Sequence, residues 1–161
     1  QKLPLTVGYF KDLCSRFMSE KSAKLAEKLT LEPPVEPVST GSVFLDEWYE
    51  KERCLRLALA QIRALRMKKD IKDLPSASDG ESIQAARTAT GMDSPLAAEQ
   101  YLNQYRLGIL DRIAPMDSFS ADAVYSYGLK LMLAERMKKF NKDEGLASYH
   151  KIYDEILGEK K

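Results

Sequence analysis

Apolar residues recur every three or four positions through most of the chain, with polar residues between them. This spacing places the apolar side chains on one face of a helix, and no stretch has the strict alternation of a half-buried strand. Prolines, glycines and N-capping hydroxyl residues separate the predicted helices. Their approximate ranges are 7–18, 20–29, 42–69, 81–90, 95–113, 117–142 and 143–158.

Local signals mark the ends of these helices. Thr6 and Ser19 are suited to cap the first two, and the proline-rich stretch "EPPVEPVSTGS" cannot continue a helix. Ser94 followed by Pro95 is a strong start signal, and "NKDEG" at 141–145 predicts a helix-ending turn. The sequence therefore predicts an all-α, single-domain helical bundle of six or seven helices over residues 1–161. Within it we expect a helical hairpin over 6–30, a proline-rich loop over 31–41 and a main bundle over 42–157.

The longest predicted helix contains "LDEWYEKERCLRLALAQIRALR", which mixes acids, arginines and leucines. At 100° per residue its large apolar side chains fall in a sector about 60° wide, which predicts a core stripe. Glu50 and Arg53 project away from it, towards water. Other charges border the stripe or lie on it, so we interpret them as a structural polar seam whose long side chains bury their stems and pair their charged ends. The stripe comprises Phe44, Trp48, Leu55, Leu59 and Ile62. The bordering charges are Glu52, Arg56 and Arg63, and Arg66 falls on the stripe itself.

The predicted helix near 117–142 carries apolar residues almost all the way round, which is typical of a central, buried helix. Glu135 falls on the same face as Val124 and Leu131. A carboxylate at such a position is costly unless a cation matches it. We therefore expect Glu135 to pair with an arginine and to set how this helix docks. The candidate arginines are Arg56, Arg63, Arg66 and Arg106.

Composition limits the function classes. The 161 residues carry 25 basic and 24 acidic side chains, a net charge of +1, so no strongly basic surface favours nucleic acid. No apolar run approaches the roughly 18 residues of a membrane span, and we expect a soluble, cytoplasmic protein. Cys14 and Cys54 lie in predicted helices without a CxxC partner, which favours buried thiols, although a disulfide between them stays open. The chain begins with Gln1, so we expect that an N-terminal piece was trimmed or left out.

Signatures of catalysis are missing. The sequence has no phosphate-binding loop, dinucleotide fingerprint, HExxH or GxSxG motif. His150 is the sole histidine, which argues against a metal site and leaves a cysteine–histidine nucleophile pair as a remote alternative. We predict no catalytic residues, no cofactor and no metal.

Four segments in order resemble the motifs of one family. They are "KLPLTVGYFKDLCSRFMSEK", "WYEKERCLRLALAQIRALR", "LNQYRLGILDRI" and "YSYGLKLMLAERMKKFNKDEG". The family is the bacterial uncharacterised family encoded beside V/A-type ATPase genes, which is regarded as the counterpart of the C-type subunit of those motors. Compared with its pattern, this chain lacks the short strand-like segment that normally comes first and a long helical insertion. The positions that match the pattern are Trp48, Glu52, Arg53, Arg56, Arg63, Arg106, Asp111, Lys130, Glu135 and Arg136.

The resemblance implies a short, non-enzymatic relative of that C-type subunit in a V/A-type rotary ATPase or ATP synthase, built as one lobe of its architecture. Such a protein would couple the central stalk to the membrane rotor ring, with the stalk and the ring as its partners on the cytoplasmic face of the inner membrane. The resemblance also adds Arg136 to the expected polar seam. Two alternatives stay open: a free-standing helical adaptor for another protein, and a nucleic-acid-associated protein that uses Arg53, Lys68, Lys69 and Lys72.

Overall fold

The computed structural model describes residues 5–68 and 79–159, with side chains described through residue 143. Every regular element in these ranges is helical, which confirms the all-α bundle. The described residues form six helices, of which the last is the longest. They are α1 (Val7–Phe17), α2 (Glu20–Glu27), α3 (Val43–Arg66), α4 (Gly80–Thr90), α5 (Pro95–Ile113) and α6 (Ala121–Glu159).

Short polar side chains cap the helices where the sequence predicts them. The hydroxyls of Thr6, Ser19 and Ser94 accept hydrogen bonds from backbone N–H groups of the first turns of α1, α2 and α5. Each satisfies one of the amide groups that a helix start leaves without a partner. Pro95 occupies the first turn of α5, where its missing N–H costs nothing.

The predicted break at 141–145 is wrong. α6 is one helix of 39 residues that passes through this segment without interruption. Gly145 costs a helix only about 1 kcal/mol relative to alanine, and no proline follows Pro115 in the sequence. The surrounding lysines, glutamates, leucines and alanines all favour helix, so they outweigh the one glycine.

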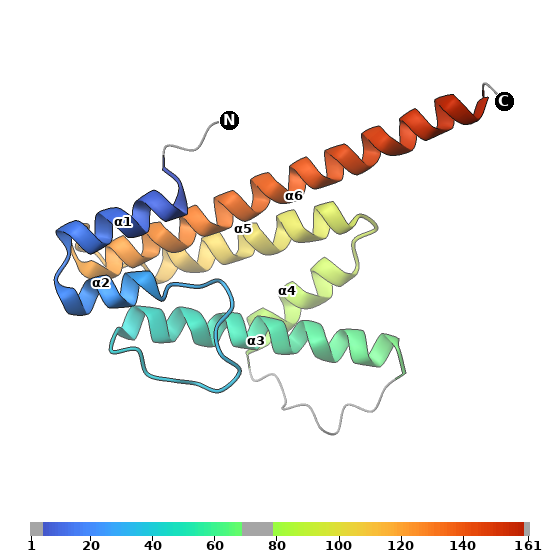
Figure 1. The fold of residues 1–161 in the computed structure, drawn as a ribbon. Coiled ribbons are helices and arrows are strands. Elements are labelled where there is room, and N and C mark those ends of the chain that lie inside the picture. The colour runs from blue at the N-terminus through green and yellow to red at the C-terminus, as the bar shows by residue number, and fades with distance from the viewer. Residues whose placement is uncertain (1–4, 69–78, 160–161) are drawn as a thin grey trace.

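The helices pack around the first half of α6 (Figure 1). α1 and α2 form a hairpin on one side of α6, and α5 runs antiparallel to it on the other. α3 crosses below, and α4 links α3 to α5. The second half of α6 extends beyond the ends of the other helices (Figure 1).

Two clusters of buried apolar side chains form the core. The larger joins α1, α2, the first half of α3 and the facing parts of α5 and α6, and the smaller joins the second half of α3 to α4 and α5. The expected core anchors occupy them. Trp48, Leu55, Leu59 and Leu131 are buried, and Ile62 and Val124 are half-buried and packed against the clusters.

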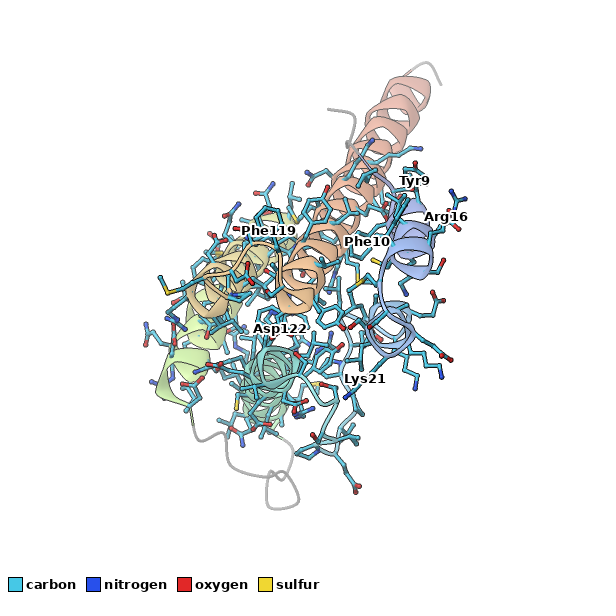
Figure 2. The ribbon with its side chains drawn as sticks, turned by 90° about the vertical axis from the view of Figure 1, so that its left-hand side faces the viewer. Tyr9, Phe10, Arg16, Lys21, Phe119 and Asp122 are labelled. Carbon is cyan, nitrogen blue, oxygen red and sulfur yellow. The ribbon has the colours of Figure 1, made fainter. Side chains whose placement is uncertain are left out.

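α6 packs tightly against the α1–α2 hairpin at Gly128, which is buried. A β-carbon added there would lie 2.5 Å from Cε1 of Phe10 and 2.9 Å from Cδ1 of Leu29. Phe10 extends from α1 towards α6 (Figure 2). Glycine is therefore the residue that lets these helices meet. Among the described residues, no helix combines the length and apolar character needed to cross a bilayer.

Candidate functional site

A buried ion pair joins α3 to α5 at the centre of the molecule. Glu52 is 3% exposed and Arg106 is 5% exposed. Nε of Arg106 donates to Oε2 of Glu52 at 2.9 Å, and Nη2 donates to Oε1 at 2.9 Å. This two-pronged geometry is the strongest form of side-chain pairing because both carboxylate oxygens and two guanidinium N–H groups are satisfied.

Further polar groups extend this pair into a network across the bundle. Arg56 donates from Nε to Oε1 of Glu52 at 2.9 Å and from Nη2 to the carbonyl of Leu31 at 3.0 Å, which holds the α2–α3 loop against α3. Nη1 of Arg106 donates to Oδ1 of Asn103, whose amide group contacts Sδ of Met137 on α6. The network therefore connects three helices and one loop.

Two more ion pairs tie α5 to α6. Lys130 pairs with Asp111 near one end of the contact, and Arg136 pairs with Glu99 near the other at 3.0 Å. We call Glu52, Arg56, Asn103, Arg106 and these two pairs the polar seam. Of the residues expected in it, five make contacts between elements: Glu52, Arg56, Arg106, Glu135 and Arg136.

Among the described residues, Glu135 forms no ion pair with an arginine, so the hypothesis that it pairs with one is wrong. Glu135 is half-buried, and its Oε1 accepts a hydrogen bond from the backbone N–H of Val7 at 2.8 Å. Val7 is the first residue of α1, where an N–H has no partner within the helix and the helix dipole favours a negative charge. The N-terminus of α1 therefore offsets the free-energy cost of placing the Glu135 carboxylate on this face of α6.

Three arginines of α3 also lie differently from the expectation. Arg63 and Arg66 are exposed, outside the seam. Arg53 does not project into water: its side chain is 15% exposed, bonding to Glu50 and to the carbonyl of Pro34. The proline-rich loop folds over it. Lys69 and Lys72 lie outside the described residues.

A second polar cluster, which the sequence did not lead us to predict, joins α3, α4 and α5. Asp79 caps α4: one carboxylate oxygen accepts from the N–H of Glu81, and the other accepts from Ser82 and Lys51. Glu81 in turn forms a two-pronged pair with Arg112 of α5 at 2.8 and 2.9 Å. The signal present in the sequence is "DGES" at the helix start, which matches an N-cap followed by an acid in the first turn.

This cluster shifts the protonation of its members. Burial raises the pKa of the Asp79 carboxyl, but hydrogen bonds from Ser82 and Lys51 outweigh it and hold that pKa below its ordinary value. The hydrogen bond to Asp79 raises the pKa of Lys51. Hydrogen bonding to Arg112 lowers the pKa of Glu81. The charged forms are therefore favoured in the folded protein.

Replacing Asp79 with alanine should lower the free energy of unfolding at neutral pH by about 1–2 kcal/mol, because α4 loses its cap and Lys51 its partner. The folded pKa of Asp79 lies below its ordinary 3.8, so its ionic stabilisation is complete above that value and is lost as pH falls through the folded pKa. Urea unfolding at several pH values measures both effects.

Asp79→Asn is the matched control because asparagine caps helices well but carries no charge. Its deficit against the natural protein should shrink below about pH 4, whereas the gap between the alanine and asparagine variants should persist. A deficit of Asp79→Asn that stays constant with pH would contradict the ionic contribution.

Neither described thiol has the character of a nucleophile. Both cysteines are free, and burial raises the pKa of the Cys14 and Cys54 thiols. The thiolate, which is the reactive form, is thereby disfavoured. The side chain of His150 lies outside the described set. Among the described residues, no three histidine, cysteine, aspartate or glutamate side chains gather as a metal site would require.

A depression on the described surface lies between the start of α1, the end of the α1–α2 hairpin and α6. We call it the α1–α6 groove. It holds about 890 Å³, and aliphatic side chains line its floor. Lysines of α6 stand along one edge, and Glu135 sits within it. Its shape and mixed lining suit a protein segment better than a small polar substrate.

No protein-family model, curated protein or solved structure matches this chain. The function has to be inferred from the chain's own residues and contacts, together with the resemblance of its four motifs.

Proposed function

We propose that the protein is a non-enzymatic component of a V/A-type rotary ATPase or ATP synthase, similar to the C-type subunit of such motors. In this role it couples the central stalk to the membrane rotor ring from the cytoplasmic face of the membrane. The proposal rests on the four motifs, which occur in the family's order across most of the chain.

The observation that carries the proposal is that charged residues matching the family's motifs form contacts between helices. The ion pair of Glu52 and Arg106 bonds α3 to α5, and Arg56 bonds α3 to the loop before it. Asp111, Lys130 and Arg136 make ion pairs between α5 and α6. Residues that meet each other in this way hold helices at fixed positions. A part that transmits torque needs such rigidity, whereas an enzyme of this size would need some of these groups free to meet a substrate.

The shape of the molecule agrees with a coupling role. α6 is packed into the bundle over its first half and continues as a single helix beyond it (Figure 1). A continuous helix transmits force along its axis without a joint. The bundle and the extension offer two separated regions, as a link between two partners requires.

Co-purification tests the proposal. The chain should be recovered in fixed ratio when the ATPase is purified from membranes of the source organism through a tag on one of its catalytic chains. Deleting the gene should leave membranes that hydrolyse ATP with greatly reduced ion pumping, because the motor and the ring are no longer linked. Absence of the chain from an intact, purified complex, together with normal pumping in the deletion strain, would rule the proposal out.

The α1–α6 groove favours a second candidate function, a free-standing helical adaptor for another protein. The same purification separates the two. An adaptor would be missing from the ATPase and would be recovered with an unrelated partner through its own tag.

A further inference from the structure

The α1–α6 groove has an aliphatic floor, and four of its five side chains are partly exposed. Leu5, Val7, Leu29, Leu31 and Met132 line it, from the start of α1, the end of the hairpin and α6. Each is a partly or largely buried side chain that faces both the core and the groove. An apolar floor bounded by charged edges is a typical docking surface for a partner.

The edge of the groove on α6 carries concentrated positive charge. Lys138, Lys139 and Lys142 are exposed, and no described acid lies within ion-pair distance of them. Lys138 and Lys142 are four residues apart on one helix face, where like charges repel. The net charge of the chain is only +1, so this positive charge is local and not part of a generally basic surface. An acidic partner would relieve the repulsion between the lysines.

Of the other charged residues that line the groove, two already have a partner within the chain and one lies across the groove from the lysines. Arg136 pairs with Glu99, and Glu135 accepts the N–H of Val7. Glu32 is exposed at the far edge. Four basic and two acidic residues line the groove, a surplus of two positive charges, and the lysines without a described acidic partner all belong to one edge.

We propose that the α1–α6 groove binds an acidic amphipathic helix of another protein. The apolar face of that helix covers the aliphatic floor, and glutamates or aspartates along one flank meet Lys138, Lys139 and Lys142. α6 continues past the groove (Figure 1), so a partner helix in the groove can lie alongside α6. The groove would bind such a helix whichever assembly supplies it, so the proposed function is not needed for this binding.

The lining disfavours other anionic partners. Single-stranded nucleic acid is bound by basic grooves in which aromatic side chains stack on bases, and none of the described residues lining this groove is aromatic. A flat, anionic membrane would reach the lysines at the edge but would leave the recessed floor uncovered. A helix satisfies both the floor and the edge.

The test uses the full chain and a labelled helical peptide about 18 residues long, because shorter peptides form helices poorly. Its leucines repeat at helical spacing and glutamates flank them. Fluorescence anisotropy should show saturable, salt-sensitive binding. Lys138→Glu, Lys139→Glu and Lys142→Glu together should weaken it by about tenfold to a hundredfold. A peptide with lysine in place of glutamate should prefer this variant, which reverses the charge pairing.

A matched control places the same three charge changes on and just after α2, at Lys21, Lys24 and Lys28, which are exposed and do not line the groove (Lys21 is labelled in Figure 2). This variant should bind the acidic peptide like the natural chain, and circular dichroism checks that both variants are folded. Equal binding of a scrambled peptide with the same charge, a single-stranded oligonucleotide or phosphatidylserine vesicles would overturn the proposal. Equal loss in both lysine variants would overturn it too.

Discussion

Replacing Arg106 with alanine should lower the free energy of unfolding by about 3–5 kcal/mol. Glu52, which is 3% exposed, would keep its buried charge and lose both hydrogen bonds from the guanidinium. Arg56 would still pair with it, but Arg56 is half-exposed and reaches only Oε1. Urea unfolding followed by circular dichroism measures the loss as a lower midpoint with an unchanged slope.

Arg112 is the matched control, because it is an arginine of the same helix that also forms a two-pronged pair with a glutamate. That pair is on the surface, with the two side chains 54% and 42% exposed. Arg112→Ala should therefore cost at most about 1 kcal/mol. Similar losses from the two alanine variants would show that burial does not set the strength of the Arg106 pair.

A second comparison separates the cost of breaking the pair from its net contribution. Glu52→Leu combined with Arg106→Met removes both charges and fills the site with apolar side chains, so it should cost less than Arg106→Ala. The remaining loss, about 1–3 kcal/mol, comes from Asn103, whose buried Oδ1 loses its donor. Under the proposed function this double variant would fold well but fix the angle between α3 and α5 less strictly. Normal folding with impaired ion pumping would be the expected result.

The fold was predictable from the sequence because its signals are local. Thr6, Ser19 and Ser94 act on amide groups within three residues of themselves, and Pro95 acts at its own position. The core stripe of α3 follows from helical spacing, so Trp48, Leu55 and Leu59 were found without knowing what they touch. Local capping and periodicity therefore determine where helices start and which face is buried.

The pairing of charges was only partly predictable because it depends on which helices meet. Helical projection placed Glu52 and Glu135 equally well beside the core, but α5 faces Glu52 and the start of α1 faces Glu135. Arg63 satisfied the same spacing as Arg56 and yet lies beyond the packed part of α3. The α1–α6 groove could not be predicted from the sequence for the same reason, since residues from three distant segments form it.

Replacing Gly128 with leucine should be the second most damaging change, with a loss of about 3 kcal/mol in the free energy of unfolding. Even a single β-carbon would lie 2.5 and 2.7 Å from two ring carbons of Phe10. Phe10 is 5% exposed, so its ring cannot move aside into solvent without leaving the core. The α1–α2 hairpin would have to shift away from α6, and thermal or urea unfolding would report the loss.

Alanine substitutions at two helical glycines isolate this close contact. Gly108 of α5 is exposed and has no heavy atom within 4 Å of an added β-carbon, so Gly108→Ala should stabilise the protein by about 0.5–1 kcal/mol through helix propensity alone. Gly128→Ala gains the same propensity but meets Phe10, so it should destabilise. Shortening Phe10 to leucine should recover part of that loss, because the two changes share one space. If Gly128→Ala stabilised the protein as much as Gly108→Ala, α6 and α1 would not be in the tight contact that the structure places at Gly128.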